Sequence, residues 1–505
     1  MHIDEINQLR SALGRDAADV DLVETHISWV LLAGTDAWKI KKPVNFGFVD
    51  FSTPELRARA CADELRLNRR LAPELYLGVV SVVARNGTLA IGGAGRFVEY
   101  AVHMRRFDHA CVASDLADRG ALRADQLDAF AADLARFHAS LPPSDAQCPF
   151  GKPDDLQART LENFEPIQSR LGGSGELASL RERLTGCFDA LAERMERRRA
   201  DGFVRECHGD LHLGNLVEWG GRLLAFDCLE FNAALRWGDV AAEIAFPYMD
   251  LMARGHPRMA WRFLDRYLAR SGDYAALGLL GYCTAYRALV RAKVAALSAT
   301  DGDPATGGIR HYVELAREFV RPRRGALVFM HGVSGSGKSV VADEIAQRLG
   351  GVRIRADVER KRLAGRDAGD RLEPEFYTDQ WHSRTMQRLL DLGLAVAAAG
   401  YVAVLDATWL DPQARANAID QVRARGVSCA IVSVHADVDT LRERVAARSG
   451  LGNDPSDADL AVLEAQLAGF TPLTCDEAGY ALTVDTCDGR LDYDELAVQL
   501  RRLIE

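Results

Sequence analysis

The 505-residue sequence lacks the features that mark secreted, membrane-spanning and disulfide-stabilised proteins. Its ten cysteines, from Cys61 to Cys487, form no Cys-x-x-Cys pair, which favours reduced thiols over a disulfide framework or a zinc site. The longest apolar run, from about Leu392 to Leu405, is too short to span a bilayer and is interrupted by Gly400. The segment Met1 to Glu5 is acidic, and no secretory signal is visible. We therefore expect a cytoplasmic protein with no membrane partner.

The sequence also lacks an excess of positive charge. Its formal net charge is −10, which argues against a dedicated non-specific nucleic-acid binder, because that function needs a basic face. Apolar residues make up 48% and charged residues 27%, an ordinary composition for a soluble globular protein. The length exceeds what one hydrophobic core usually serves, so we expect two or three folding units.

The first 320 residues predict two unequal lobes. Residues 1–104 contain strand-like runs around one helix, whose start is indicated by Ser52-Thr53-Pro54-Glu55. Residues 105–320 have a helical pattern, apart from a β-rich patch between Val204 and Phe226. We therefore expect an α+β bilobal domain, with a small lobe at 1–104 and a helical lobe at 105–320.

The basic segment from Arg321 to Gly325 is the best linker candidate. Strand and helix signals alternate beyond it, from residue 326 to residue 505. Such alternation is typical of a mostly parallel sheet that helices cover on both faces. We therefore expect an α/β domain at 326–505.

The segment from His208 to Asn215 reads His-Gly-Asp-Leu-His-Leu-Gly-Asn, and Asp227 follows an apolar pair downstream. Phosphoryl transfer needs a carboxylate near the acceptor hydroxyl, and an amide oxygen and a second carboxylate that hold magnesium. Asp210, Asn215 and Asp227 have the chemistry and the order for these three roles. The alternative is a turn in which Asp and Asn cap local N–H groups. No third ligand completes a metal site with His208 and His212, which we expect to be structural.

This pattern resembles the His-Gly-Asp-x-x-x-x-Asn signature of aminoglycoside phosphotransferases, which are relatives of protein kinases. The following segment, from Phe226 to Asn232, is similar to a branch of that family that is fused to a P-loop kinase. The resemblance implies that Asp210 is the catalytic base and that Asn215 and Asp227 hold the metal. It also implies that ATP and Mg²⁺ are the cofactors.

In kinase-like folds a lysine on a small-lobe strand clamps ATP and pairs with a glutamate of the next helix. Ala37-Trp38-Lys39 resembles that strand, so Lys39 is preferred, and Lys41, on the same face, is the alternative. Glu64 is the expected partner, with a solvated surface carboxylate as the alternative. The strand region from Glu99 to Met104 is the expected adenine hinge, by position only. The full glycine-rich loop of protein kinases is missing, and only Gly34 lies in a nearby turn.

A second nucleotide motif begins at Gly332 and ends at Ser339, and it matches Gly-x-x-x-x-Gly-Lys-Ser between an apolar strand and an amphipathic helix. Backbone N–H groups of such a loop cradle phosphates. Lys338 is expected to reach the β- and γ-phosphates, and Ser339 and Asp406 are expected to ligate magnesium. The alternative for Asp406 is a local cap. The predicted phosphate-loop glycines are Gly332, Gly335 and Gly337.

The Asp-x-x-Arg spacing of Asp357 and Arg360 follows the second strand of this part. It resembles P-loop kinases of the polynucleotide-kinase, zeta-toxin and gluconate-kinase type. The resemblance implies that Asp357 activates the acceptor hydroxyl and that Arg360 holds an anionic substrate group; a helix N-cap is the alternative for Asp357. Arg444 and Arg448 lie four residues apart on a helix, as in a catalytic lid or a solvated basic face.

The whole chain therefore predicts a bifunctional ATP-dependent kinase that acts on small hydroxylated substrates. One alternative gives the rear domain a nucleotide or a polynucleotide end as acceptor, motivated by its basic residues from Arg353 to Arg362. A nucleic-acid partner is not favoured, because the composition is acidic and no stripe of aromatic residues is present. Another alternative makes one domain a nucleotide-binding regulatory module. The front family includes kinases of several substrate classes, so the fold does not specify the acceptor.

Overall fold

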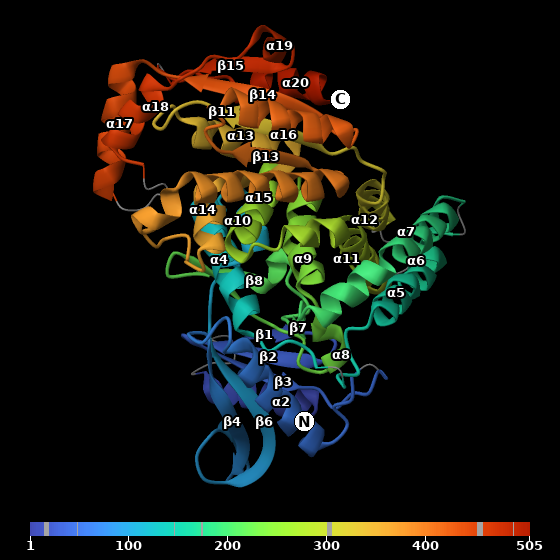
Figure 1. The fold of residues 1–505 in the computed structure, drawn as a ribbon. Coiled ribbons are helices and arrows are strands. Elements are labelled where there is room, and N and C mark those ends of the chain that lie inside the picture. Colours follow the sequence, from blue (N-terminus) through green and yellow to red (C-terminus); the bar gives the residue numbers. More distant parts are fainter. Residues whose placement is uncertain are drawn as a thin grey trace. The chain divides into compact units, whose positions relative to one another are not determined.

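The structure is a computed structural model, and it describes residues 1–14, 20–47, 49–145, 147–172, 175–299, 306–451, 458–487 and 489–505. The side chains of residues 448–451 lie outside this description. The chain divides into two compact units, and Figure 1 labels most of their helices and strands. Unit 1 contains Met1–Arg254 and Cys283–Ala316, and unit 2 contains Gly255–Tyr282 and Arg317–Glu505. In the described part of the chain, no helix is long and apolar enough to cross a membrane.

Unit 1 begins with an antiparallel sheet of six strands in the order β1-β2-β3-β6-β4-β5. Gly34 has a positive φ of 57° and closes the β2–β3 hairpin, as the sequence predicts. Asn86 and Gly87 close the β4–β5 hairpin with φ values of 52° and 78°. The strands are β1 (Val20–Glu24), β2 (Ser28–Ala33), β3 (Asp36–Lys41), β4 (Tyr76–Arg85), β5 (Thr88–Ile91) and β6 (Arg96–Arg105).

Helix α2 (Pro54–Asn68) starts where the sequence predicts. The Thr53 hydroxyl accepts the Leu56 N–H at 3.3 Å, and Pro54 occupies the first helical position, where its missing N–H costs nothing. One face of the helix is buried, and Glu64 lies on this face with no exposed side-chain surface. The capped helix therefore carries a carboxylate into the interior of the small lobe.

The expected adenine hinge at Glu99 to Met104 is wrong. These residues lie inside β6, which pairs with β3 on one side and β4 on the other. Glu99 is buried and accepts a hydrogen bond from Arg57 at 2.8 Å. A strand that is hydrogen-bonded on both sides has no backbone groups left for adenine.

The rest of unit 1 is mainly helical, with two short two-stranded sheets, β7 with β10 and β8 with β9. Helix α11 begins in unit 2 and continues into unit 1. The helices are α1 (Ile3–Leu13), α3 (Ala113–Asp118), α4 (Ala124–Ser140), α5 (Pro153–Glu162), α6 (Phe164–Leu171), α7 (Gly175–Ala200), α8 (Ala233–Arg236), α9 (Val240–Ala253), α11 (Leu277–Ser298) and α12 (Thr306–Phe319). The short strands are β7 (Val204–Glu206), β8 (Leu216–Trp219), β9 (Arg222–Ala225) and β10 (Trp237–Asp239).

Unit 2 contains a parallel five-stranded sheet in the order β12-β13-β11-β14-β15. The predicted α/β domain with a mostly parallel sheet is confirmed. The strands are β11 (Ala326–His331), β12 (Gly351–Arg355), β13 (Val402–Asp406), β14 (Ser428–His435) and β15 (Ala481–Asp485). The helices are α10 (Pro257–Ser271), α13 (Lys338–Leu349), α14 (Ala356–Leu363), α15 (Asp379–Ala398), α16 (Pro412–Ala424), α17 (Val438–Leu451), α18 (Leu460–Ala468), α19 (Cys475–Ala478) and α20 (Tyr493–Ile504).

Helices cover both faces of this sheet because its strands are apolar on both faces. On one face Val328, Met330 and Val404 pack with Ile345 of α13 and Leu500 of α20. On the other face α15 crosses β13 and β11, where Gly393 lies close to Leu405 and Leu327. The two layers hold the carboxyl ends of β11, β12 and β13 at one edge.

A buried ion pair stabilises the loop that follows β13. Arg415 of α16 is fully buried, pairs with Glu477, and donates to the Trp409 carbonyl at 2.6 Å. We expect Arg415→Ala to lower the free energy of unfolding of unit 2 by about 3–5 kcal/mol, because it leaves Glu477 buried without its cation. Urea unfolding of the intact chain measures the effect. Arg425→Ala, at an exposed arginine that follows the same helix, is the control and should change little; an equal loss in both variants would contradict the role of the pair.

Candidate active sites

The segment between β7 and β8 brings Asp210 and Asn215 together. The Asn215 side-chain nitrogen donates to the Asp210 carbonyl at 2.9 Å and to its carboxylate at 3.0 Å. His212 lies 3.5 Å from the same carboxylate. Burial works to raise the pKa of Asp210, but the hydrogen bond and charge of His212 outweigh it and lower the pKa to about 2. Asp210 is therefore an ionised carboxylate at neutral pH that can accept a proton.

The β8–β9 hairpin places Asp227 beside this loop. Asn215 precedes β8 and Asp227 follows β9, and the Phe226 N–H donates to the Asn215 carbonyl at 2.9 Å. A ring nitrogen of His208 lies 2.9 Å from the Phe226 carbonyl, which supports the structural role expected for this histidine. Asp227 itself has a positive φ of 60°, a conformation that costs energy for a residue with a side chain. The hairpin thus holds both predicted metal ligands against the loop of Asp210.

Three buried residues that the sequence analysis missed hold this loop in place. The Glu243 carboxylate accepts the N–H groups of His208 and Gly209, at 2.6 Å and 3.1 Å. Arg287 of α11 donates to the Gly209 carbonyl at 3.0 Å, and Asp250 accepts the Leu213 N–H at 2.9 Å. A signal was present in the sequence, since Glu243 and Asp250 are the charged residues of an otherwise apolar helix and lie seven residues apart, on one face.

Both candidate ATP lysines contact Glu64. Lys39 lies 2.9 Å from one Glu64 oxygen and 2.5 Å from Asp227, whereas Lys41 contacts the other Glu64 oxygen and Glu230. The Lys41 side chain has no exposed surface, while that of Lys39 is 12% exposed and that of Asp227 is 46% exposed. Lys39 therefore faces the predicted metal ligand, and Lys41 lies behind it.

Glu230 was also missed by the sequence analysis. It lies three residues after Asp227, and its side chain is 3% exposed against Lys41. Burial raises the pKa of Glu230, and the Lys41 ammonium opposes this rise only in part. Burial also works to raise the pKa of Glu64, but Lys39 and Lys41 together outweigh it and lower that pKa. The network thus links the Asp227 segment to α2 through two buried carboxylates and one buried ammonium.

The rear nucleotide motif surrounds the first turn of α13. Gly332, Gly335 and Gly337 have φ values of 142°, 83° and 83°, and a Cβ at Gly332 or Gly335 would approach backbone oxygens within 2.8 Å. The Ser339 hydroxyl donates to Asp406 at 3.1 Å, so the structure brings the two predicted metal ligands together. The Lys338 ammonium lies 3.3 Å from the Val333 carbonyl.

Asp357 and Arg360 share a cavity of about 720 Å³ with these residues. Lys338, Ser339 and Asp406 also line it, and Arg371 contributes a further cation. The Asp357 carboxylate lies 3.8 Å from Arg360 on α14. Neighbouring parallel strands end at the same edge of a sheet, which explains why residues after β11, β12 and β13 meet here.

Of the two predicted lid arginines, Arg444 is not among the described residues that line this cavity. Arg444 donates to the Thr486 hydroxyl at 2.8 Å and approaches the Gly335 carbonyl at 3.4 Å, so it contacts the phosphate loop from outside the cavity. The side chain of Arg448 lies outside the described residues. Gln466 of α18, which the sequence analysis missed, accepts the N–H of Ser334 in the phosphate loop at 2.7 Å and lines the cavity.

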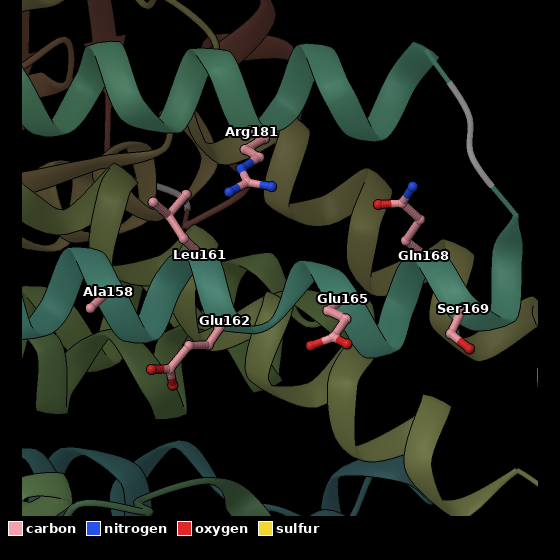
Figure 2. Close-up of a pocket in the computed structure, with 7 residues that line it drawn as sticks. All are labelled: Ala158, Leu161, Glu162, Glu165, Gln168, Ser169 and Arg181. Atoms are coloured by element: carbon pink, nitrogen blue, oxygen red, sulfur yellow. The ribbon is translucent and has the colours of Figure 1, made fainter.

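A second hollow, of about 800 Å³, lies beside α5, α6 and α7 in unit 1. Arg181 extends from α7 toward the two shorter helices (Figure 2). None of the predicted phosphotransfer residues lines this hollow. Its lining residues are Ala158, Leu161, Glu162, Glu165, Gln168, Ser169 and Arg181.

Comparisons with known proteins match two different domains in the chain. Residues 47–280 match the model of the phosphotransferase enzyme family, and residues 327–473 match an AAA domain. An uncharacterized protein of Mycobacterium tuberculosis and one of Mycobacterium bovis are each 33% identical over 459 residues, 88% of this chain and 89% of theirs. The chain belongs to their family.

The chain joins a region that matches a phosphotransferase to one that matches an AAA domain, and the predicted enzyme class is confirmed: the chain is an ATP-dependent phosphotransferase. Among solved structures, a choline/ethanolamine kinase family protein from Mesorhizobium loti has a TM-score of 0.41 and 13% identity, over 64% of this chain and 96% of that chain. A gluconokinase from Sinorhizobium meliloti has a TM-score of 0.26 and 22% identity, over 36% of this chain and 95% of that chain. These likenesses are too distant to refine the assignment.

The two lysines of β3 allow a direct test of their different surroundings. We expect Lys39→Met to abolish transfer by the front domain with a small change in stability, because Lys39 borders the half-exposed Asp227. Lys41→Met should instead lower the free energy of unfolding of unit 1 by about 3–5 kcal/mol, because Glu64 and Glu230 would remain buried around an apolar side chain. Urea unfolding and transfer of γ-phosphate from ATP into hydroxylated acceptors, followed for both variants, measure the two effects. The reverse result, with Lys41→Met stable but inactive, would assign the ATP contact to Lys41.

Proposed function

We propose that the chain carries two separate kinase sites, each of which uses ATP and Mg²⁺ to phosphorylate a hydroxyl group of a small molecule. The observation that carries the proposal is that each unit brings a base-type carboxylate, a lysine and two oxygen ligands to one place. In unit 1 these are Asp210, Lys39, Asn215 and Asp227. In unit 2 they are Asp357, Lys338, Ser339 and Asp406.

In the front site, Asp210 accepts the proton of the acceptor hydroxyl, and Lys39 holds the ATP phosphates. The Asn215 nitrogen donates to Asp210, which orients the amide oxygen as a metal ligand together with Asp227. Mg²⁺, when bound, neutralises charge on the transferred phosphoryl group. Glu64 orients Lys39, whereas Lys41 and Glu230 support Glu64 from behind. This assigns the clamping role to Lys39 rather than Lys41.

Both sites offer donors that suit Mg²⁺. In the front network two ammonium groups face three carboxylates, and Asp227 is the most exposed of the three. In the rear site the buried Asp406 Oδ2 has no hydrogen-bond partner within the described part of the chain. Carboxylate, amide and hydroxyl oxygens are the ligands that this hard cation prefers. We therefore assign Asn215 and Asp227 to one magnesium ion and Ser339 and Asp406 to another.

In the rear site, Asp357 activates the acceptor hydroxyl, and Arg360, with Arg371, binds an anionic group of the same molecule. A cavity of about 720 Å³ has the size of a typical small-molecule site. The Arg360 guanidinium lies 5.1 Å from the centre of the Tyr377 ring, which lines the same cavity and fixes the direction of the guanidinium. A small hydroxylated anion fits this lining.

The basic residues that motivate a nucleic-acid acceptor do not form an exposed stripe. Arg353 is 10% exposed and Arg355 is 15% exposed at the side chain, and both lie within 4 Å of Asp406. Lys361 is buried, and Arg362 pairs with Glu359. Affinity for nucleic acid depends on cations that reach phosphates at the surface, so these inward contacts favour the small-molecule acceptor.

We expect Asp210→Ala and Lys338→Ala to remove two different activities. Each variant should lose at least about a hundredfold in transfer of labelled phosphate to one group of acceptors and keep the other, because each residue serves only its own unit. Transfer of γ-phosphate from ATP into a panel of hydroxylated metabolites and a 5′-hydroxyl oligonucleotide measures both.

Asp201→Ala and Lys152→Ala, at an exposed aspartate and an exposed lysine, are the matched controls and should keep both activities. If Lys338→Ala abolished nucleotide binding by the rear unit but left every transfer activity unchanged, the rear unit would be a regulatory module. If the 5′-hydroxyl oligonucleotide were the acceptor lost in Lys338→Ala, the rear domain would be a polynucleotide kinase.

Arg360→Ala tests the anionic acceptor. We expect it to raise the KM of the rear reaction for carboxylate- or phosphate-bearing acceptors at least about tenfold, since a charged hydrogen bond contributes about 1.5–3 kcal/mol. The KM for ATP should stay within twofold. Steady-state kinetics with paired charged and neutral acceptors measures the difference. Equal losses for charged and neutral acceptors would show that Arg360 does not recognise the anion. Arg366→Ala, at a nearby exposed arginine, serves as the control.

A further inference from the structure

Helix α10 precedes the phosphate loop by more than sixty residues in the chain, yet it packs inside unit 2. It lies against β12 and α13, the strand and helix next to the rear nucleotide site. Its Trp261 is buried, stacks edge-on with Tyr401 at 5.4 Å, and covers Gly350 at the end of α13. The matched phosphotransferase region, residues 47–280, therefore supplies an element of the P-loop unit.

Asp265 of α10 binds the edge of the parallel sheet. Strand β12 is an edge strand, and Asp265 Oδ1 accepts the backbone N–H of Arg353 at 2.6 Å. Asp265 is 1% exposed, so both its charge and the N–H group that it binds are removed from water. An edge strand that is buried needs such a partner for its backbone groups. The side chain of Asp265 thus fixes β12 at Arg353, and the side chain of Arg353 points toward the nucleotide site.

Arg353 connects this contact to the predicted metal ligands. Its guanidinium donates to the Ser339 carbonyl at 2.8 Å, and the same nitrogen lies 3.9 Å from Asp406 Oδ2. Its other terminal nitrogen lies 4.0 Å from Asp265 and 3.7 Å from Asp343 of α13. Taken as a whole residue, Arg353 is 9% exposed, and it does not line the cavity of the rear site.

A second arginine secures α10 to the same helix. Arg266 binds Asp343 through two hydrogen bonds of 2.8 Å each, in the fork geometry that arginine and carboxylate favour. The burial of Asp343 works to raise its pKa, but Arg266 and Arg353 outweigh it and lower that pKa. Helix α10 is therefore attached to both β12 and α13 by charged groups that are mostly buried.

We propose that Arg353, held by Asp265 of α10, is a positioning residue for the magnesium ligands of the rear site. The guanidinium fixes the backbone of Ser339, whose hydroxyl meets Asp406, and it balances part of the charge on Asp406 before the metal binds. A lysine cannot make the same set of contacts, because it offers one point charge instead of a planar fork. The inference rests on the proposed rear nucleotide site and adds that α10 is required for its geometry.

Nucleotide titrations of the intact chain test the inference. A fluorescent ATP analogue is titrated with and without Mg²⁺, and the signal lost in Lys338→Ala identifies the rear site. We expect Arg353→Met to keep the affinity without Mg²⁺ within twofold and to lower the gain in affinity from Mg²⁺ about tenfold, the usual effect of removing a group that orients metal ligands. Arg353→Lys should recover part of this gain. Asp265→Asn, which retains an oxygen for the Arg353 N–H, should give an intermediate loss.

Arg348→Met is the matched control, because Arg348 lies on α13, the helix that Arg353 contacts, but pairs with Glu344 and Asp494 away from the metal ligands. If Mg²⁺ raised the nucleotide affinity of Arg353→Met as much as that of the wild type, while the unfolding midpoint fell, Arg353 would be only structural. That result would overturn the inference. If Arg353→Met fails to fold, an unchanged gain in both Arg353→Lys and Asp265→Asn overturns it equally. A wild-type chain with no Lys338-dependent signal would instead refute the rear nucleotide site itself.

Discussion

Glu64 lies fully buried between two lysine ammonium groups, and the interior of the front site is built around this cluster of charge. A carboxylate removed from water is stable only where cations and hydrogen bonds replace its hydration. Lys39 and Lys41 are two residues apart on β3 and so point to the same face of the sheet, where α2 presents Glu64. Lys41 in turn requires Glu230, which ties the segment after Asp227 to the small lobe.

A buried charge also needs partners of opposite sign in the rear unit, where the buried group is a cation and its partners are carboxylates. Arg353 is a buried cation that has Asp265, Asp343 and Asp406 around it, each from a different element. Because β12 lies at the edge of the sheet, its backbone also needs a partner, and Asp265 meets both requirements. The geometry of the predicted magnesium ligands therefore depends on a helix that is distant in sequence from the phosphate loop.

Local patterns predicted much of the architecture correctly. The cap and proline at Thr53 and Pro54 and the glycine-rich loop before Lys338 each depend on backbone conformations within a few residues. The predicted catalytic pair of Asp210 and Asn215 is also local, since the two residues are five positions apart. The prediction of an adenine hinge at Glu99 to Met104 was wrong, because a strand in the centre of a sheet and a strand that leads to a hinge look alike in sequence.

The sequence by itself determined that the chain has an α+β part followed by an α/β part with a P-loop, because spacing and periodicity report on neighbouring backbone. The resemblance of the segment from His208 to Asn215 to a known family identified the first part as kinase-like. Tertiary structure decided which of Lys39 and Lys41 faces Asp227 and that Glu230 pairs with Lys41. It also decided that Glu243 and Arg287 support the front loop and that α10 completes the rear unit. Each of these depends on a charged side chain meeting a group that lies far away in the sequence, from 34 residues for Gly209 and Glu243 to 189 for Lys41 and Glu230. Only the packed fold specifies which carboxylate reaches which cation, because burial makes that pairing obligatory and a linear pattern does not encode it.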